Sequence, residues 1–542
     1  MGSMWIMLIA VACFLIAYFV YAERLKNRWG IDNSQITPAH EKRDGIDYVP
    51  ARKPVLVGHH FASIAGAAPI IGPVTASAFG WGPVLIWIIL GGIFIGGVHD
   101  MGSIFSSVRH GGRSIAQVID KNVGRQGKQL FSLFAWLTLI LVIAAFMNVV
   151  ADAFVSTPEA ATAEIVLIGA AIAFGLLRYR TDISFPLQVV IGIAIVAVAI
   201  WIGMMAPFEL AFNAWLWVFL IYVFIASVTP VWILLQPRDF LLSFLLYAIL
   251  IGSFIGVIAG NPSVELAGFT SFRTELGFMF PILFVTVACG AISGFHSLVS
   301  SGTTSKQLDK ETDSKPVGYG SMMFECFLAV IALLAASIVT GGVADELIAE
   351  GGPILLFAHG VGTFLGALGI PEDVGIVFGT LTVAAFAMTT LDTATRLARY
   401  IFVEYFVPEE EEVEGEKQGI LGSRFVATGI TVIFAFALAY TGAWDAIWPI
   451  FGSANQLLAA LALLSLAVWL AARGIGNLHV IIPMVFMFAV TLTALVLETI
   501  SNFQDENYLL AIIAIVLFVL ALILGKLALG FLRPKEGAEA AE

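Results

Sequence analysis

The stretch GHHFASIAGAAPIIGP, residues 58–73, lies inside an apolar run but is poorly suited to one continuous transmembrane helix. Pro69 and Pro73 each lack an N–H group, and three glycines loosen the backbone. Broken helices are tolerated at membrane depth only where protein or water satisfies the freed backbone groups. His59 and His60 add ionisable side chains at the same depth, which is a functional hypothesis by default. The pattern indicates the substrate site of a secondary transporter.

The composition of the chain is that of a polytopic membrane protein. Of its 542 residues, 59% are hydrophobic and 12% are charged, whereas a soluble domain has about 45–50% apolar and about 25% charged residues. The net charge of −12 includes an acidic loop at 409–416, interpreted as a solvated connector, and nothing indicates nucleic-acid binding. The three cysteines match neither a disulfide framework nor a metal-binding spacing. Residues 4–22 have no basic segment before them, which predicts a retained first span rather than a signal peptide.

Apolar runs of about 17–25 residues predict about 15 transmembrane helices. Lys and Arg residues concentrate in alternate loops, beginning with 23–57, and this alternation places the N-terminus outside and the C-terminus in the cytoplasm. The alternation holds only if 353–369 is an external helical hairpin or a re-entrant piece. The predicted spans are near 5–22, 58–79, 83–105, 130–152, 164–177, 184–206, 215–235, 240–259, 278–300, 317–341, 374–398, 424–440, 445–472, 479–499 and 508–531.

A second segment, GFHSLVSSG at 294–302, resembles the first. Two glycines and a histidine of 58–66 recur in it at the same spacing. With the orientation above, the first segment runs outward and the second runs inward. Paired, glycine-interrupted helices of opposite direction indicate an inverted repeat with a site between its halves. Chance similarity is the alternative, because the chain has 52 glycines.

Five motifs resemble those of a known family: HHFASIAGAAPIIGP (59–73), GGVHDM (96–101), SGFHSLVSSGTTSKQ (293–307), TTLDTATRLARY (389–400) and FGSANQLLAALAL (451–463). The family is that of carbon starvation protein A (CstA), whose members are associated with uptake of pyruvate or small peptides coupled to protons. The resemblance implies an all-α polytopic membrane protein with a five-plus-five inverted-repeat core. That core would contain two broken helices, at 58–79 and 278–300, and extra helices would surround it.

The implied repeat predicts how the single transporter domain is divided. Between the two broken helices there are six intact predicted spans where the simplest version of the fold has four, so two helices must be inserted. The predicted segments are 5–57 (first span and basic cytoplasmic loop), 58–206 (first repeat), 207–277 (inserted helices, at 215–235 and 240–259), 278–472 (second repeat) and 473–542 (C-terminal helices).

The residues near the two helix interruptions are the candidates for substrate binding. Half-helix ends expose N–H groups that bind anions, and an imidazole can bind a carboxylate or carry a proton. The alternatives are close helix packing by the small residues and an interfacial position for His59. Asn455 and Gln456 are predicted to form hydrogen bonds between helices. The predicted substrate-binding residues are His60, Ser63, Gly66, His296, Ser300, Gly302 and Thr303.

A further group of polar residues is predicted to couple transport to a proton or another cation. A buried carboxylate such as Glu325 must be paired or protonated, and hydroxyls on the eighth core helix complete a cation site in the related fold. Asp392 and Arg396 lie at i and i+4, so a local ion pair is the alternative there. Asp100 is predicted to pair with Arg109 as a cytoplasmic gate, with plain interfacial charge as the alternative. The predicted coupling residues are His59, Glu325, Thr389, Thr390 and Asp392.

These features predict a secondary active transporter of the cytoplasmic membrane, not an enzyme. It would import a small carboxylate, first of all pyruvate, by proton-coupled alternating access, and the alternative substrate is a small peptide. The sequence contains no P-loop for direct ATP drive. A remote alternative is an intramembrane metalloenzyme built on the histidines, although no H-E-x-x-H motif is present. We predict no cofactor and no resident metal, with membrane lipid as a partner and the oligomeric state left open.

Overall fold

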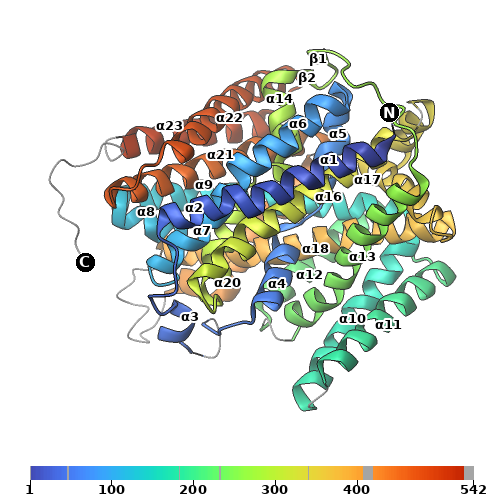
Figure 1. Ribbon diagram of the computed structural model, residues 1–542, viewed down its shortest axis with the longest axis horizontal. Helices are drawn as coiled ribbons and strands as arrows, with labels where there is room; N and C mark the ends of the chain where they lie inside the picture. Colours follow the sequence, from blue (N-terminus) through green and yellow to red (C-terminus); the bar gives the residue numbers. More distant parts are fainter. Residues whose placement is uncertain are drawn as a thin grey trace.

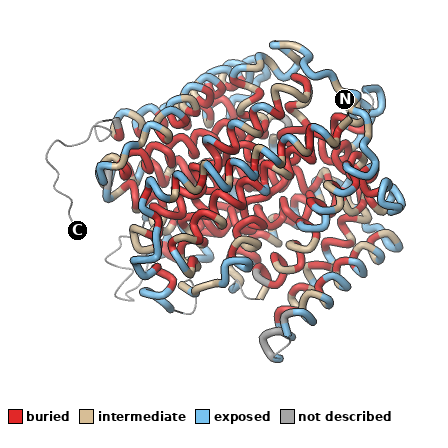
Figure 2. The backbone as a smooth tube through the Cα atoms, viewed as in Figure 1, coloured by how far each residue is buried: buried red, intermediate tan, exposed pale blue. Residues whose placement is uncertain are grey.

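The computed structural model of the chain describes residues 2–44, 48–181, 184–230, 233–339, 341–406, 419–442 and 444–529. Its helices form one bundle whose buried residues concentrate in the middle (Figures 1 and 2). The described strands are β1 (Arg273–Thr274) and β2 (Gly277–Phe278), a short antiparallel pair in one loop. The predicted all-α class is confirmed, and the acidic loop at 409–416 falls outside the described residues.

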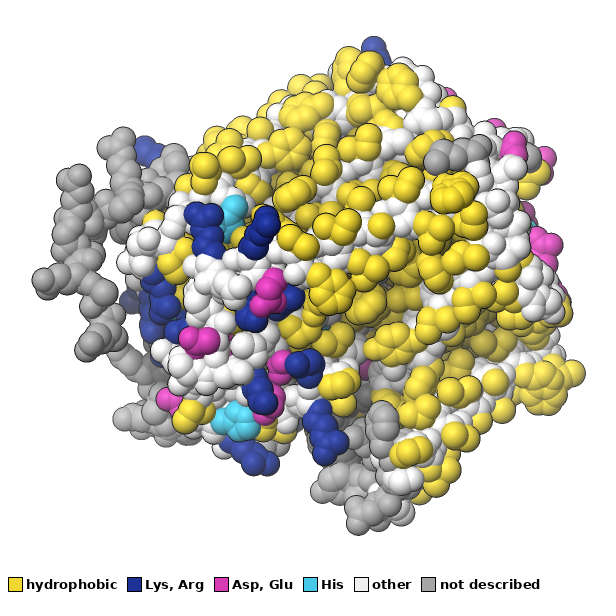
Figure 3. Space-filling view, in the orientation of Figure 1, with side chains coloured by type: hydrophobic (Ala, Val, Ile, Leu, Met, Phe, Trp, Pro, Cys, Tyr) yellow, Lys and Arg dark blue, Asp and Glu magenta, His cyan; other side chains and the backbone are white. Residues whose placement is uncertain are grey.

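The surface of the bundle suits lipid rather than water. Hydrophobic side chains cover most of the face in Figure 3, while Lys and Arg gather toward one end of it. Large apolar side chains such as Phe19, Ile193 and Trp201 are more than half exposed on the outer helices. An apolar surface of this extent is unfavourable in water and is expected of a multi-pass membrane protein.

The helices follow one another along the chain, and the connections between them differ in length. Their bounds are α1 (Ser3–Ile16), α2 (Ala22–Trp29), α3 (Pro38–Glu41), α4 (Lys53–Ile64), α5 (Ala68–Ala76), α6 (Trp81–Gly91), α7 (Gly97–Arg109), α8 (Ile115–Val123), α9 (Arg125–Ser156), α10 (Pro158–Arg180), α11 (Phe185–Met205), α12 (Phe212–Val228), α13 (Leu235–Gly260), α14 (Met279–Val287), α15 (Gly294–Gly302), α16 (Ser321–Ser337), α17 (Gly341–Gly366), α18 (Glu372–Phe406), α20 (Arg424–Thr441), α21 (Trp444–Ala472), α22 (Leu478–Gln504) and α23 (Tyr508–Leu529).

The number of membrane-spanning helices agrees with the prediction, although the membership differs slightly. Among the described residues, 14 helices are long and apolar enough to span, or 15 if the bent pair α4–α5 counts as one span. This set includes α17, whose helical backbone is interrupted at Gly351 and Gly352. The break lies just before the predicted hairpin at 353–369, so the hairpin stays a prediction. The predicted span at 215–235 corresponds to α12, a shorter apolar helix of 17 residues.

The predicted interruption of 58–79 is present. Helix α4 ends at Ile64, helix α5 begins at Ala68, and the two are bent by 50°. Pro69 lies in the first turn of α5, where its missing N–H costs no intrahelical hydrogen bond. The second predicted interruption is also present, because residues 288–293 separate α14 from α15.

The two broken helices are in contact with one another. A Cβ added at Gly72 of α5 would lie 2.5 Å from the carbonyl oxygen of Val287 at the end of α14. A side chain at this position would therefore displace backbone, and glycine permits the approach. The two helix interruptions lie at the centre of the bundle as a result.

The similarity between 58–66 and 294–302 does not relate equivalent halves of a repeat. The first segment lies mainly before its interruption, in α4, whereas the second lies after its interruption and forms α15. An inverted repeat would match the half before one break with the half before the other. Instead α4 and α15 lie side by side, and His60 Nδ1 is 2.8 Å from Thr304 Oγ1 just beyond α15. The predicted proximity is correct, but the alignment that suggested it is wrong.

The packing favours a different inserted pair from the predicted 207–277. Helices α12 and α20 each pack against both α9 and α18, which is the relation expected of equivalent spans in two repeats. Helices α10 and α11 form a hairpin at the edge of the bundle, packed on α13 and α18 (Figure 1). This arrangement suggests α10–α11 as the insertion, and the repeat boundaries remain a proposal.

Candidate functional site

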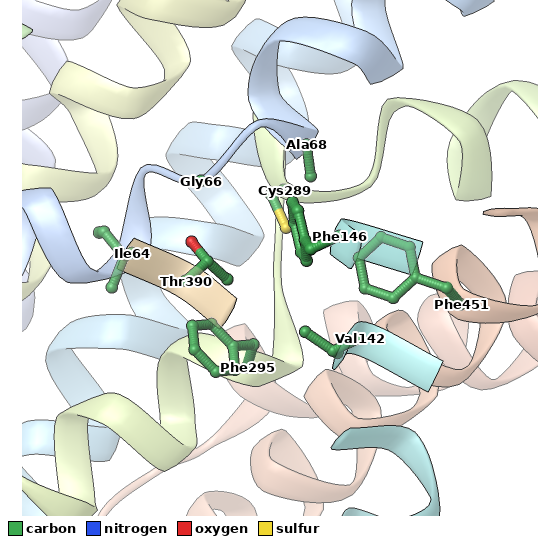
Figure 4. A pocket seen from close by; sticks show the side chains of 9 residues that line it. All are labelled: Ile64, Gly66, Ala68, Val142, Phe146, Cys289, Phe295, Thr390 and Phe451. Carbon is green, nitrogen blue, oxygen red and sulfur yellow. The ribbon is translucent and has the colours of Figure 1, made fainter. Parts of the chain in front are cut away.

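A small cavity lies where the two helix interruptions meet (Figure 4). Helices α9, α18 and α21 close it on the remaining sides. Its volume of about 10 Å³ has room for about one water molecule, so this conformation is closed around the site. The lining residues are Ile64, Gly66, Ala68, Val142, Phe146, Cys289, Phe295, Thr390 and Phe451.

The wall of the cavity combines aromatic rings with a few polar groups. Phe146 and Phe451 pack edge to face with ring centroids 5.8 Å apart. The hydroxyl of Thr390 is buried and has no hydrogen-bond partner among the described residues. Ala68 begins α5 beside the cavity. Pro69 has no N–H, and the N–H groups of Ile70 and Ile71 bond the carbonyl oxygen of Ala67. The N–H of Ala68 therefore remains without an intrahelical acceptor. A helix N-terminus and a free hydroxyl together suit an anionic group on a small ligand.

Polar side chains of α21 form hydrogen bonds with backbone groups on both sides of the second interruption. Asn455 Oδ1 accepts a hydrogen bond from the backbone N–H of Phe295 at 2.9 Å, in the first turn of α15. Gln456 Nε2 donates to the carbonyl oxygen of Phe284 at 2.6 Å. These bonds satisfy backbone groups that lipid could not. The predicted hydrogen bonds between helices are present, and they serve the broken helix.

A buried acid–base cluster adjoins the cavity. Asp100 receives two hydrogen bonds through imidazole Nδ1 atoms, one from His99 at 2.7 Å and one from His296 at 2.8 Å. His296 Nε2 lies 3.3 Å from Glu325 Oε2, and no side chain of this cluster is more than 1% exposed. Neither oxygen of Glu325 has a hydrogen-bond donor among the described residues. The cluster reaches the cavity wall through Cys289.

The same cluster contains the one described set of side chains whose spacing suits a metal. Donor atoms of Cys289, His296 and Glu325 all lie within 4.8 Å of one another. The groups also have contacts that need no ion. His296 faces Glu325 at ion-pair distance, and Asn455 Nδ2 lies 3.5 Å from Cys289 Sγ. We therefore interpret the set as an acid–base cluster.

One of the seven predicted substrate-binding residues lies on the cavity wall, and the other six do not line it. Of the seven, Gly66 lines it, and Thr390 from the coupling list also does. The hydroxyls of Ser63 and Thr303 donate to carbonyls of their own helical turns, and the Ser300 hydroxyl is buried without a described partner. The remaining three are His60, paired with Thr304, His296 in the acid–base cluster, and Gly302 at the end of α15.

The predicted pairing of Asp100 with Arg109 is wrong. Asp100 is fully buried on α7 and bound to two histidines. Arg109 lies nine residues later at the end of α7 and pairs bidentately with Glu311, which precedes α16. Nine residues span about 13.5 Å of helix, so the two side chains belong to different layers of the bundle. The ion pair at the end of the bundle is Arg109–Glu311.

The predicted coupling residues on α18 do not converge on one site. Thr389 donates to the carbonyl of Ala385 in its own helix, while Thr390 faces the cavity. Asp392 points elsewhere, because residues two apart on a helix face nearly opposite directions. Its described cation is Arg238 of α13, at 2.7 Å.

The local ion pair considered for Asp392 is also absent from the described contacts. Arg396 Nη2 instead donates to the carbonyls of Ala226 and Thr229, each at 2.8 Å, at the C-terminus of α12. A cation there satisfies carbonyls that the helix leaves unpaired. His59 is 28% exposed and lies 3.7 Å from Asp239, so it is neither fully buried nor on the cavity wall.

Sequence reasoning missed Glu164 and Arg238, which form a buried pair at 2.7 Å. The short predicted span 164–177 put Glu164 at a helix end, but α10 begins at Pro158 and carries it into the bundle. Arg238 fell in a predicted loop, but α13 begins at Leu235. The available signal in the sequence was that Glu164 and Arg238 each lie at or next to the predicted end of an apolar span.

Comparison with known proteins identifies the family. The family model described as carbon starvation protein CstA matches residues 2–349 and 341–494. The pyruvate/proton symporter BtsT of Escherichia coli is 30% identical, with 94% of this chain and 83% of that protein aligned. The peptide transporters CstA of Escherichia coli and Bacillus subtilis are each 31% identical, covering 86% and 84% of this chain and 76% and 82% of their own lengths. The chain belongs to the CstA family, as predicted.

Solved structures support the fold. A manganese transporter from Eremococcus coleocola, in complex with an aromatic bis-isothiourea substituted compound, aligns with a TM-score of 0.51. The alignment covers 90% of this chain and 98% of that one at 13% sequence identity. Similarity at this level concerns the arrangement of helices alone.

Proposed function

We propose that this member of the CstA family is a secondary transporter that imports a small carboxylate together with protons across the cytoplasmic membrane. Pyruvate is the first candidate substrate and a small peptide the second. The observation that carries the proposal is the closed cavity between two helix interruptions, with an acid–base cluster behind its wall. The names of the relatives, a pyruvate/proton symporter and peptide transporters, support the same reaction class.

The cavity favours the smaller substrate. A carboxylate can meet the N-terminus of α5 and the hydroxyl of Thr390, while a methyl group packs against Phe146 and Phe451. A closed site with room for about one water must expand for any substrate, and the expansion is smaller for pyruvate than for a dipeptide. Because Gly66 has no side chain, the first interruption can lie close to Thr390 of α18 and still leave room for a ligand.

We assign the coupling proton to the contact between His296 and Glu325. Asp100 orients His296 through Nδ1, so that Nε2 faces Glu325. With a neutral imidazole, Glu325 would be a buried carboxylate without donors, which is costly. A proton on either group removes that cost, and its loss toward the cytoplasm restores it. Cys289 connects this cluster to the cavity wall, so substrate and proton can influence one another.

The predicted orientation rests on where the basic side chains lie on the surface of the bundle. Basic side chains at the ends of α2 and α7 would face the cytoplasm, with the N-terminus outside. The variant Arg273→Cys, changed in β1, is then labelled by an impermeant maleimide in intact cells. Labelling only after cell lysis contradicts this orientation.

The test is uptake of labelled pyruvate and of labelled dialanine into proteoliposomes with an imposed inward proton gradient. We expect pyruvate to accumulate above empty liposomes and the gradient to increase the rate. Accumulation of the dipeptide alone would select the second candidate. If neither compound enters, or if chelators abolish uptake that metal restores, transport in this form is wrong.

A further inference from the structure

A second buried charge cluster lies where α10, α12, α13 and α18 meet, apart from the cavity. Arg238 donates through Nη1 to Asp392 Oδ2 and through Nη2 to Glu164 Oε1, each at 2.7 Å. Tyr222 donates to the same oxygen of Asp392 at 2.8 Å and accepts from Arg238 at 2.9 Å. Each of the three charged side chains is 1% exposed. We call Glu164, Arg238 and Asp392 the buried triad.

The charges of the buried triad do not balance. One guanidinium faces two carboxylates, which leaves one negative charge in a dry interior. Glu164 Oε2 and Asp392 Oδ1 also have no hydrogen-bond partner among the described residues. An uncompensated buried charge is strongly unfavourable. One proton on either carboxylate makes the triad neutral while leaving both contacts of Arg238 in place.

The neighbouring titratable and charged groups do not remove this imbalance. Tyr222 on α12 is neutral when it donates its proton to Asp392. Asp239 on α13 faces His59 on α4 at 3.7 Å, where His59 is partly exposed. Arg396 on α18 directs its guanidinium to carbonyls at the end of α12. None of these described groups brings a further positive charge into contact with Glu164 or Asp392.

We propose that the buried triad binds one proton, shared between Glu164 and Asp392, in addition to the proton at His296 and Glu325. This inference rests on the proposed function and extends it to a stoichiometry. One carboxylate O–H bond forms with a proton from the outer side and breaks on the cytoplasmic side, and no electron is transferred. The peripheral hairpin α10–α11 supplies Glu164, so it is part of the coupling machinery.

Two bound protons have a measurable consequence for a monocarboxylate. A substrate anion that crosses with two protons moves one positive charge inward, whereas one proton would make the cycle electroneutral. An inside-negative potential of about 59 mV then raises the equilibrium accumulation tenfold. Replacing Glu164 by glutamine leaves one carboxylate for Arg238, a neutral pair that needs no proton.

The experiment counts protons per substrate in proteoliposomes free of sodium. Labelled pyruvate and dialanine report substrate, a trapped pH dye reports protons, and valinomycin with potassium sets the potential. We expect two protons per substrate and stimulation of pyruvate uptake by a negative interior. Glu164→Gln and Asp392→Asn should each lower the count to one and abolish the response to potential. Glu159→Gln, which removes a charge from the first turn of the same helix, is the matched control and should keep the count at two.

The outcomes separate the two proposals. No uptake of either compound by the unaltered protein refutes the proposed function. Uptake with one proton per substrate leaves that function standing and overturns the inference, as does a count of two that persists in Glu164→Gln. A response to potential that requires added sodium shows that a metal cation carries the second charge instead of a proton, which also overturns it. If both variants unfold, a count of one proton per substrate in the unaltered protein still overturns the inference.

Discussion

Replacing Gly66 by alanine is expected to disable the cavity without dismantling the fold. An added Cβ would lie 2.5 Å from Thr390 Oγ1 and 3.4 Å from Phe146 Cζ. Contact at 2.5 Å is too close, so the Thr390 hydroxyl must turn away. It can do so because threonine in a helix has a second rotamer that bonds the carbonyl one turn earlier.

The magnitude follows from two contributions. Overpacking a tight interior costs about 1–3 kcal/mol, and the easy rotation of Thr390 places the cost to stability near the lower end. The larger effect falls on substrate binding, because the rotated hydroxyl no longer faces the cavity. A hydrogen bond to a charged group contributes about 1.5–3 kcal/mol. At 1.4 kcal/mol per factor of ten, KM is expected to rise roughly 10- to 100-fold.

The assay is initial-rate uptake in proteoliposomes, with melting temperature as the check on folding. Gly169→Ala on α10 is the matched control, because no atom lies within 4 Å of its added Cβ. In a Thr390→Ala background, Gly66→Ala should add little, since both changes remove the same hydroxyl from the cavity. Wild-type KM and maximal rate in Gly66→Ala would refute the assignment of this cavity as the substrate site.

Three further changes test the surrounding structure. Glu325→Gln should lower the count by one proton per substrate but spare pyruvate exchange, whereas Glu498→Gln, also buried, should leave both intact; equal changes in the two variants contradict the coupling role. Charge reversal at Arg109 or Glu311 should lower the free energy of unfolding by about 3–5 kcal/mol, and exchanging the two residues should restore most of it in denaturation measurements. Asn455→Ala leaves a backbone N–H of α15 unpaired and should cost about 1–3 kcal/mol, read as a lower melting temperature; an unchanged melting point would show that the interruption is supported otherwise.

The breaks in the two helices could be predicted from residue types. Proline lacks an N–H and glycine lacks a side chain, and both properties act locally on the backbone. Pro69 and Gly66 therefore have the same effect on the helix whatever the tertiary structure. Apolar runs of sufficient length likewise predict spans wherever they occur. The hairpin at 353–369 was inferred from charge alternation and stays a prediction, because the break of α17 at Gly351 and Gly352 lies just before it.

The partners of buried charges could not be predicted in the same way. Asp392 had Arg396 one turn away in sequence, yet its described cation is Arg238, which lies 154 positions earlier. Asp100 shares a helix with Arg109, yet its carboxylate oxygens accept hydrogen bonds from two imidazoles instead. Both partners depend on which helices are neighbours and on the face each helix turns inward. A list of predicted spans gives neither the neighbours of a helix nor the face that it turns inward.

The sequence by itself determined that this protein crosses the membrane many times, that two of its helices are interrupted, and that it belongs to the CstA family. Each of these is decided by local chemistry or by motifs. Tertiary structure alone decided that the interruptions meet around a cavity, that Glu164 reaches Arg238 from a peripheral hairpin, and that 58–66 and 294–302 lie side by side without being repeat equivalents. The physical reason is that helix packing sets rotation and neighbourhood, and in a dry interior those two properties choose the partner of every charge.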